Sequence, residues 1–488
     1  MLATTGPDTL AALRAILGTD CVRAPLAEDA PELQDYRRRY RGRALALVEP
    51  RDTAQVAALL RLCHERRIGV VPQGGNTGYN GGATPDASGS QILVALRRMS
   101  RIRAVDAANF TLTAEAGCTL HAVQTAAEAA DRYFPLSLGS QQSCQIGGNL
   151  ATNAGGIHVL RFGMMRDLAL GIEAVLPDGS VLQDLRGLRK DNTGYDLKSL
   201  LIGSEGTLAI ITAATLKLWP AQRATATALL AVASPAAALR LLAVLQAAAG
   251  ERLTSFELMP RAALELLHTQ LPALRQPLQP MPPYAVLCEL SSAASEPLDS
   301  LLAEVLQSDA AQAEIGDAVL ARSGAERLAL WQLRESIPEA QRRFGPSLKH
   351  DISVPLDAIP LFMERVADWS RREVPEAILV CYGHAGDGNL HCNLSARSGT
   401  DRAAFEARED GLRAAVHALV AEFHGSISAE HGIGQAKVQE LLRHASPVKL
   451  ALMRALKAAI DPRGIMNPGK LLPATAGGAA GTGGAAIQ

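Results

Sequence analysis

The chain has 488 residues and a mass of 51.4 kDa, and at roughly 100–200 residues per domain it is long enough for several domains. Its 48 Lys+Arg and 49 Asp+Glu give a net charge of −1, which argues against a nucleic-acid partner, and 48% hydrophobic residues exclude general disorder. Glycine is abundant, with 42 residues, whereas aromatic residues make up only 4%. The positions of the glycines therefore need an explanation.

The cysteines indicate the redox state of the compartment, and the apolar segments indicate whether the chain spans a membrane. The 7 cysteines form no CxxC pair and show no disulfide spacing, which indicates a reducing compartment and mostly inert thiols. The N-terminus has no basic region before an apolar core, so we expect no signal peptide and a cytoplasmic location. No run of about 20 apolar residues predicts a membrane span. The most apolar stretch, 224–249, predicts a strand and then a helix capped by Ser234, with Pro235 at its first position.

Residues 1–43 predict an N-terminal helical segment. Its basic run at 37–39 is more typical of an accessory segment than of a charge-driven binding site. A βαβ pattern follows, with a strand at 44–50, a helix at 54–67 that starts from a capping signal at Asp52, and a strand at 68–73. Further on, Asp178-Gly179 predicts a hairpin turn between two strands.

Two glycine-rich stretches stand out, at 74–82 and 135–156. Glycines directly after a strand let backbone N–H groups approach an anion closely. Neither stretch matches the GxGxxG or GxxxxGK[ST] motifs, so the Rossmann and P-loop interpretations fail. Either stretch alone could be an ordinary turn cluster, but the pair could enclose one elongated dinucleotide.

A histidine cluster lies further along the chain. His384 and His391 flank a Gly-Asp-Gly turn that can aim both imidazoles at one point, although a single histidine would more often be a core residue. Glu430 offers a third ligand. The adjacent His431, at an apparent strand end, would then point elsewhere and act as a base. A His₂Glu set with open positions is typical of catalytic Zn²⁺, and Asp387 between two glycines is more typical of turn shaping.

These motifs resemble known families. VVPQGGNTGYNGGATP, SLGSQQSCQIGGNLATNAGG and GSEGTLAIIT resemble the FAD-binding segments of the vanillyl-alcohol-oxidase/PCMH-type fold. GHAGDGNLHCN, SAEHGIG and DPRGIMNPGK resemble the FAD-linked oxidase C-terminal domain. Together they resemble the FAD-dependent D-2-hydroxyacid dehydrogenases over about residues 40–473, and within them the D-2-hydroxyglutarate dehydrogenase branch.

The resemblance implies an α+β fold. The expected parts after the N-terminal segment are a PCMH-type FAD-binding domain of two α+β subdomains at 44–222 and a substrate or cap domain with an antiparallel sheet at 223–425. A short helical C-terminal segment at 426–473 then completes the active site. The low-complexity tail, 474–488, is expected to be disordered.

The resemblance also implies noncovalent FAD, because Asn76 occupies the position where some members tether the flavin through a histidine. His158, near the second segment, is expected to face solvent or to cap a helix. The residues implied to bind FAD come from all three segments and from the C-terminus: Pro72, Gly74, Gly75, Asn76, Thr77, Gly78, Tyr79, Pro135, Gly139, Ser140, Cys144, Gly147, Gly148, Thr152, Asn153, Gly155, Gly156, Glu205, Gly206, Ile211 and Asn467.

The substrate residues come from the same branch. On composition alone, Arg334 and Lys349 would be surface charges, but the patterns W-x-x-R-E-x-I and K-x-D-x-S-x-P imply that they hold a substrate carboxylate. Asn393 is implied to contact the substrate, and His431 to be both a substrate contact and the general base. His384, His391 and Glu430 are the implied Zn²⁺ ligands. Pro338 departs from the pattern, because animal members carry a hydroxyl residue there, and this bears on which acid is used.

The expected function is oxidation of a D-2-hydroxy acid, D-2-hydroxyglutarate first, by hydride transfer to FAD with metal-assisted deprotonation. The alternatives are D-lactate or glycolate oxidation, or a flavin electron-transfer subunit without a substrate of its own. A reductase of the UDP-N-acetylenolpyruvoylglucosamine type would lack the GHAGDGNLH segment. An electron-transferring flavoprotein or a quinone is the expected acceptor, and a homodimer is a family-level expectation.

Overall fold

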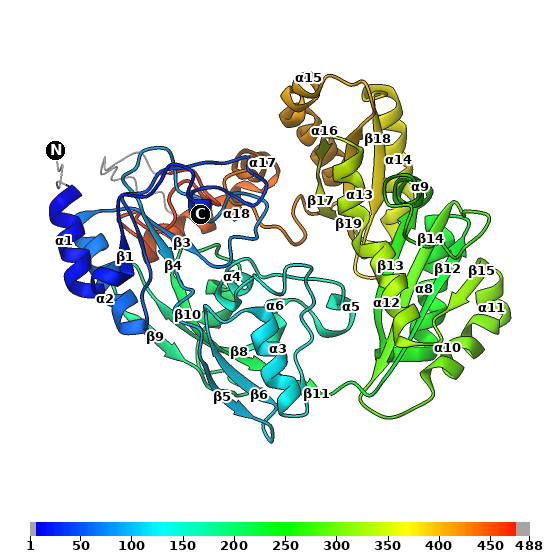
Figure 1. The fold of residues 1–488 in the computed structure, drawn as a ribbon, viewed down its shortest axis with the longest axis horizontal. Helices are drawn as coiled ribbons and strands as arrows, with labels where there is room; N and C mark the ends of the chain where they lie inside the picture. Colours follow the sequence, from blue (N-terminus) through cyan, green and yellow to red (C-terminus); the bar gives the residue numbers. More distant parts are fainter. Residues whose placement is uncertain (1–5, 475–488) are drawn as a thin grey trace.

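The computed structural model describes residues 6–474 and shows two α+β halves that meet at a central site (Figure 1). The first half contains residues 6–222 together with the returning C-terminal segment, and the second half is the cap at 223–425. Apart from Ala474, the tail expected to be disordered lies outside the described residues.

The first sheet of the FAD-binding half has the strand order β1-β2-β4-β3. Strands β2, β3 and β4 are parallel, as the predicted βαβ unit requires, and β1 is antiparallel to β2. The Asp52 side chain accepts a hydrogen bond from the Gln55 amide at 2.8 Å and so caps α2 as expected. Its elements are α1 (Gly6–Leu17), η1 (Thr19–Cys21), β1 (Val22–Arg23), η2 (Pro31–Leu33), β2 (Ala46–Val48), α2 (Thr53–Arg66), β3 (Val70–Gln73) and β4 (Ile92–Ala95).

The prediction of a helical N-terminal segment is wrong beyond Leu17. Residues 24–45 contain one short 3₁₀ turn and otherwise run without helix along the FAD-binding half. The buried Asp35 carboxylate accepts hydrogen bonds from the backbone amides of Arg37, Arg39 and Tyr40. These bonds fix a compact turn instead of a helix, because an aspartate that binds nearby amides competes with helical hydrogen bonding.

The second sheet is antiparallel throughout, in the order β5-β6-β10-β8-β9. The Asp178-Gly179 turn joins β8 to β9 as predicted, with Gly179 at φ +84°. The elements of this part are β5 (Ile102–Asp106), β6 (Thr111–Glu115), α3 (Leu120–Ala129), β7 (Arg132–Tyr133), α4 (Ile146–Ala151), α5 (Val159–Phe162), α6 (Met165–Leu168), β8 (Ala169–Val175), β9 (Val181–Asp184), α7 (Leu197–Leu201), β10 (Ile210–Lys217) and β11 (Trp219–Pro220).

The cap contains two antiparallel sheets with helices packed against them (Figure 1). The apolar stretch at 224–249 forms a strand and a helix as predicted, and the Ser234 hydroxyl accepts from the Ala237 amide at 3.1 Å. The larger sheet has the order β13-β14-β12-β15. Its elements and helices are β12 (Ala224–Val232), α8 (Pro235–Ala249), η3 (Gly250–Arg252), β13 (Leu253–Pro260), α9 (Arg261–Gln270), β14 (Tyr284–Ser292), α10 (Leu298–Gln307), α11 (Asp309–Gln312), β15 (Ile315–Leu320), α12 (Gly324–Glu335) and α13 (Ile337–Phe344).

The smaller sheet carries several site residues of the cap, among them His391 and Asn393 on β19. Strand β19 pairs with β18 on one side and with β16 and then β17 on the other. This sheet and its helices consist of β16 (Ser347–Leu348), β17 (Asp351–Ser353), η4 (Leu356–Ala358), α14 (Ile359–Glu373), β18 (Ala377–Tyr382), β19 (Asn389–Ala396), α15 (Arg402–Ala407) and α16 (Glu409–Glu422).

The C-terminal segment leaves the cap and returns to the FAD-binding half, where α17 (Val438–His444) and α18 (Pro447–Ile460) lie (Figure 1). A parallel bridge joins Met466 to Val70 on β3, and the buried Ile465 and Met466 belong to the core of the first sheet. The Lys457 ammonium donates to the Thr207 carbonyl at 2.7 Å. The chain therefore crosses between the halves twice, and the return places residues 426–434 at their junction.

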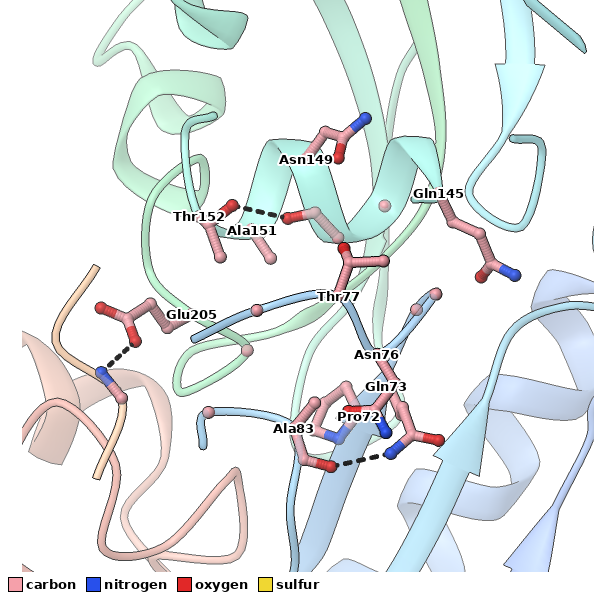
Figure 2. A pocket seen from close by; sticks show the side chains of 18 of the residues that line it. Pro72, Gln73, Asn76, Thr77, Ala83, Gln145, Asn149, Ala151, Thr152 and Glu205 are labelled. Atoms are coloured by element: carbon pink, nitrogen blue, oxygen red, sulfur yellow. Dashed lines mark hydrogen bonds between the residues drawn. The ribbon is translucent and has the colours of Figure 1, made fainter. Parts of the chain in front are cut away.

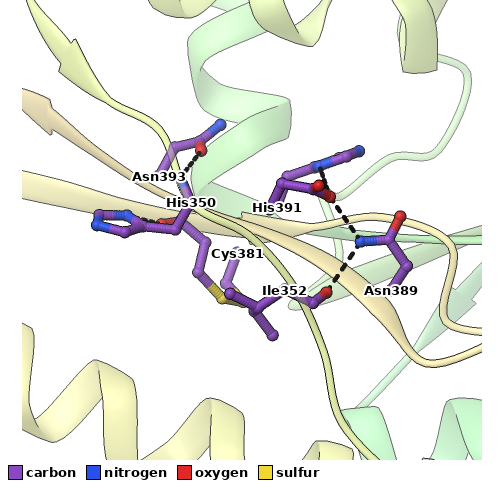
Figure 3. Close-up of a disulfide and its surroundings, with 8 residues drawn as sticks. His350, Ile352, Cys381, Asn389, His391 and Asn393 are labelled. Atoms are coloured by element: carbon purple, nitrogen blue, oxygen red, sulfur yellow. Dashed lines mark hydrogen bonds and ion pairs between the residues drawn. A yellow bond between two sulfur atoms is a disulfide. The ribbon is translucent and has the colours of Figure 1, made fainter. Parts of the chain in front are cut away.

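The expectation that no cysteine pairs is wrong for Cys381 and Cys392, which form a disulfide between β18 and β19 (Figure 3). The two residues are direct cross-strand partners with Cα atoms 4.1 Å apart. Their spacing in the sequence matches no recognised motif, so only the hairpin register brings them together. The five free cysteines are buried, and burial raises the pKa of Cys63 and Cys288 to about 12, as expected of inert thiols.

Candidate active site

The two predicted glycine-rich stretches pack against each other and line a cavity (Figure 2). A Cβ atom on Gly75 would lie 1.9 Å from the Ser143 carbonyl oxygen, so only glycine allows this approach of the loops. At Gly78 the corresponding space is open. The glycines thus do two things: some bring the loops together, and others leave backbone uncovered beside the cavity.

Most of the residues implied to bind FAD lie in cavity walls. Tyr79, Gly139, Ser140 and Gly155 line a second, adjoining cavity. Pro135, Cys144, Asn153, Gly156 and Asn467 line neither cavity. The residues in the first cavity are Pro72, Gly74, Gly75, Asn76, Thr77, Gly78, Gly147, Gly148, Thr152, Glu205, Gly206 and Ile211.

The five residues outside the cavities have supporting contacts instead. The Asn467 amide donates to the carbonyls of Gly82 and Glu205, and the Asn153 side chain accepts from the Arg166 amide. A Cβ on Gly156 would lie 2.1 Å from the Ser137 carbonyl. Pro135 accepts a hydrogen bond from His158, and the Cys144 thiol is buried against Asn149. These residues hold the loops that line the cavity.

The first cavity fits a dinucleotide in its polar chemistry. Its wall contains no lysine or arginine among the described residues, so an anionic group there would be held by backbone N–H groups. The Gln145 side-chain oxygen is buried in this wall and has no hydrogen-bond partner within residues 6–474. Sequence reasoning missed Gln145 and Asn149, whose only signal was their position inside the second glycine-rich stretch.

His158 occupies the N-cap position of α5, as expected, although its side chain makes no capping hydrogen bond and is half-buried. The Nδ1 atom lies 3.0 Å from the Pro135 carbonyl oxygen and 3.2 Å from the Tyr133 hydroxyl. The ring therefore holds Pro135, the first residue of the second glycine-rich stretch, through its backbone carbonyl.

The predicted metal group is assembled. His384 follows β18 and His391 lies on β19, so the Gly-Asp-Gly turn brings both imidazoles to the same side, with ring centroids 5.5 Å apart. The donor atoms of His384, His391 and Glu430 all lie within 4.8 Å of one another. Asp387 accepts from the Asn389 amide at 3.1 Å and shapes the turn, as expected.

Sequence reasoning missed Glu257, on β13, which orients the first histidine. Its carboxylate accepts from His384 Nδ1 at 2.5 Å and from Arg334 Nε at 2.6 Å. Burial would raise the pKa of Glu257, but Arg334 and His384 hold it at about 2. Burial would lower the pKa of His384, but the carboxylates of Glu257 and Glu430 raise it to about 9. A carboxylate on the far nitrogen is the outer contact that orients metal-binding imidazoles.

The interpretation of residues 428–434 as a strand end is wrong. They form a loop, and the backbone amides of Glu430 and His431 both donate to Asp351 Oδ2, at 2.8 and 2.9 Å. The two side chains therefore do not alternate as in a strand, and both line the second cavity. His431 Nδ1 lies 3.5 Å from the same carboxylate oxygen.

Asp351 is the second residue without a predicted role, although it stands inside the K-x-D-x-S pattern. Its other oxygen lies 3.6 Å from His391 Nδ1 and accepts a hydrogen bond from the side-chain amide of Asn389. The same side-chain amide also donates to the Ile352 carbonyl (Figure 3). Burial would raise its pKa, but His431 and His391 hold it well below the usual range. Asp351 thus ties β17, β19 and the loop at 428–434 together.

The second cavity is lined by the predicted substrate residues Arg334, Lys349 and Asn393 together with Pro338. The guanidinium of Arg334 is buried over the Tyr382 ring, 4.8 Å from its centroid. The Asn393 amide is engaged by protein, because it donates to Gln341 and accepts from the His350 amide. His431 lines both cavities, so it marks the place where they join.

Family models match almost the whole described chain. The FAD binding domain model matches residues 44–184, and the model for FAD linked oxidases, C-terminal domain, matches residues 221–471. The chain belongs to the FAD-linked oxidases. Its PCMH-type FAD-binding domain and its cap therefore have the α+β fold expected from the motifs.

Relatives of this FAD-linked oxidase include three from distant organisms. The mitochondrial D-2-hydroxyglutarate dehydrogenase of Bos taurus is 40% identical, over 96% of this chain and 84% of the relative. The D-2-hydroxyglutarate dehydrogenase of Xanthomonas citri is 36% identical, over 90% of this chain and 91% of the relative. The D-2-hydroxyglutarate–pyruvate transhydrogenase of Saccharomyces cerevisiae is 32% identical, over 95% of this chain and 94% of the relative.

Solved structures share the fold. The structure of p-cresol methylhydroxylase with substrate bound matches with a TM-score of 0.73 at 16% identity, over 96% of this chain and 97% of that chain. An alkyldihydroxyacetonephosphate synthase matches with a TM-score of 0.71 at 17% identity, over 95% and 84%. At this identity the likeness establishes the arrangement of the two halves and nothing about the substrate.

Proposed function

We propose that this FAD-linked oxidase oxidises D-2-hydroxyglutarate to 2-oxoglutarate. The observation that carries the proposal is the position of His431 at the junction of the two cavities, beside the His384, His391 and Glu430 donors and in the same cavity as Arg334 and Lys349. The names of the relatives agree with this substrate. The presence of His384, His391, Glu430 and His431 together also counts against an electron-transfer subunit. Such a subunit needs no site for a hydroxy acid.

Two groups complete this site. The glycine-lined cavity and the buried free oxygen of Gln145 fit FAD, and two imidazoles with a carboxylate, one imidazole backed by Glu257, fit Zn²⁺ or another divalent ion. When bound, FAD supplies the two-electron acceptor and the metal ion supplies a Lewis acid for a hydroxyl and its carboxylate. His384, His391 and Glu430 would hold the metal ion.

The side chains of the chain have separate roles. His431 accepts the proton of the α-hydroxyl, and the Asp351 carboxylate behind it fixes the ring and balances the charge that the proton brings. Arg334 and Lys349 orient the substrate through charge-assisted bonds to carboxylate. Asn393 holds the backbone of His350 in place and presents its amide to the cavity wall.

An external acceptor, such as an electron-transferring flavoprotein or a quinone, then takes the electrons. A homodimer and a cytoplasmic location stay predictions; the relatives from Bos taurus and Arabidopsis thaliana are named as mitochondrial. None of the described helices is both long enough and apolar enough to cross a membrane.

The experiment is anaerobic reduction of the bound flavin, followed near 450 nm, with D- and L-2-hydroxyglutarate, D-malate, D-lactate and glycolate. Bleaching by D-2-hydroxyglutarate at the lowest concentration is expected. Preference for D-lactate or glycolate would identify a different substrate of the same family. Bleaching by none of the acids would favour the electron-transfer subunit. Elemental analysis tests the metal: the His391→Ala variant should lose it, and the exposed control His268→Ala should keep it.

A further inference from the structure

The N-terminal turn at 35–40 reaches the substrate cavity, although its basic run was expected to be accessory. Asn76 in the first glycine-rich loop donates to the Gln34 carbonyl at 2.8 Å, and Arg39 forms an ion pair with Glu409 on α16 of the cap. The Tyr36 ring lies 5.7 Å from the Tyr79 ring, which in turn lies 4.7 Å from the His431 ring. The turn is thus held from both halves beside the candidate base.

Arg37, in this turn, lines an outer cavity that continues the substrate cavity. The two cavities share Tyr36, Tyr79, Pro338 and Lys349. Arg37 and Lys349 line the outer cavity together, and the charge of Arg37 acts on the Lys349 ammonium. Arg37 and Lys349 therefore share the outer cavity, which Arg38 and Arg39 of the same turn also line.

Neither cation is held in an ion pair in the part of the chain that the structure describes, although the charge of Glu409 acts on Arg37. Among residues 6–474, the side chains of Arg37 and Lys349 form no ion pair and no hydrogen bond, although both are half-buried. Arginines elsewhere on the same wall are paired, Arg342 with Glu339 and Arg402 with Glu406. Holding two like charges in a partly desolvated space costs free energy, and an anion placed between them would recover it.

Pro338, which lines both cavities, offers no hydrogen bond to such an anion, because its side chain can donate none. Arg334 keeps its terminal N–H groups for the substrate, but its Nε donates to Glu257, which also binds His384, so its guanidinium lies at the metal-group end of the cavity. The guanidinium of Arg37 supplies donors on the Lys349 side of the cavity.

We propose that Arg37 and Lys349 together bind the remote carboxylate of a dicarboxylic substrate, which makes Arg37 a specificity-determining residue. The proposal rests on the proposed function, in that it assigns the second carboxylate of the same substrate. It predicts that Arg37 discriminates between acids with and without a terminal carboxylate and has little part in the chemical step.

The test compares the holoenzyme with Arg37→Met and with Arg372→Met, a matched control on α14 whose side chain is exposed, unpaired within the described residues and outside the lining of both cavities. Calorimetric titration uses glutarate, which has two carboxylates and no hydroxyl, and pentanoate, which has one. Arg37→Met should weaken glutarate binding roughly 10–100-fold, the range of a lost charge-assisted bond. It should leave pentanoate binding unchanged, and Arg372→Met should change neither.

Kinetics supply the second readout. Arg37→Met should raise KM for D-2-hydroxyglutarate with little change in kcat, leave D-2-hydroxypentanoate oxidation within about twofold, and be largely rescued in Arg37→Lys. Equal losses for both acids, or no loss for either, would overturn the proposal. Glutarate binding that depends on Arg37 in a protein that oxidises no 2-hydroxy acid would instead refute the proposed function and leave the anion site standing.

Discussion

At the scale of single residues, the site is organised by two buried carboxylates that are not themselves proposed ligands. Glu257 binds Arg334 and His384 at once, and Asp351 accepts from the amides of the loop that carries His431. A buried carboxylate between two donors fixes the positions of both, because separating either would leave a charge unpaired. The reactive side chains are therefore positioned before substrate arrives.

The first prediction concerns the candidate base. His431→Ala should lower kcat roughly 10²–10⁴-fold, the range for loss of a general base, and leave FAD bound. The measurements are steady-state turnover and the flavin-to-protein absorbance ratio. Near-normal turnover would remove His431 from the mechanism, and loss of flavin would show that the ring acts on the FAD cavity instead.

The second prediction is a pH dependence. Burial and the like charge of Arg37 lower the pKa of Lys349 to about 8, so this ammonium carries its charge below pH 8 and loses it above. Because the cation binds carboxylate, kcat/KM for D-2-hydroxyglutarate should fall as pH rises through about 8. The profile for D-2-hydroxypentanoate should show no such fall.

Arg37→Met supplies the control for this profile. Removing the like charge raises the pKa of Lys349, so the fall should move to higher pH, while Arg372→Met should leave it in place. A fall shared by both acids, or one that does not move in Arg37→Met, would contradict the assignment to Lys349.

At the scale of secondary-structure elements, α12 is positioned by a buried carboxylate on the larger sheet of the cap. Glu289 on β14 accepts two hydrogen bonds from Arg327, at 2.7 and 2.8 Å, and one from Trp331, at 2.7 Å, both of α12. Arg334 lies one turn further along the same helix. The buried glutamate therefore sets where a substrate residue lies without touching the substrate cavity.

The third prediction follows from this network. Glu289→Ala should lower the free energy of unfolding of the cap by about 2–4 kcal/mol, somewhat less than for a fully buried pair because the Arg327 side chain is 32% exposed. Urea unfolding followed by tryptophan fluorescence measures it. The control, Glu314→Ala, breaks a surface pair with Arg240 and should change stability little. Similar losses for the two variants would contradict this account.

At the scale of the whole molecule, the site exists only when the returning segment is docked on the FAD-binding half. The Asn80 side chain donates to the carbonyls of His431 and Gly432, and the half-buried Glu205 carboxylate accepts from the amides of Ile433 and Gly434. The same segment reaches Asp351 in the cap. The loop at 428–434 thus joins the two halves at the point where their cavities meet.

The fourth prediction tests this docking. A Cβ on Gly434, at φ +54°, would lie 2.2 Å from the Asn80 carbonyl oxygen, so Gly434→Ala should push the loop away from the FAD-binding half. We expect kcat/KM to fall roughly 10²-fold, since misplacement by about 1 Å has that effect. Gly411→Ala, on α16 with no atom within 4 Å of the added Cβ, is the control and should retain full activity. Full activity in Gly434→Ala would show that the loop tolerates displacement.

The sequence by itself determined whatever is local or carried by a motif. Capping at Asp52 and Ser234, the hairpin at Asp178-Gly179 and the turn that pairs His384 with His391 follow from short-range backbone chemistry, which acts wherever the chain is placed. The glycine excess also had a local cause, because several of these glycines permit the approach of two loops that no side chain would allow.

Only the tertiary structure decided the rest, because it depends on contacts between residues far apart in the sequence. Glu257 meets His384 across 127 positions, and no spacing in a single sequence reveals such a pair. Residues 428–434 form a loop and not the predicted strand end, because their amides donate to Asp351. Cys381 pairs with Cys392 because the register of the hairpin places them opposite each other. The basic run at 37–39 gained its place beside the substrate cavity in the same way, since a charge acts on what is near it in space.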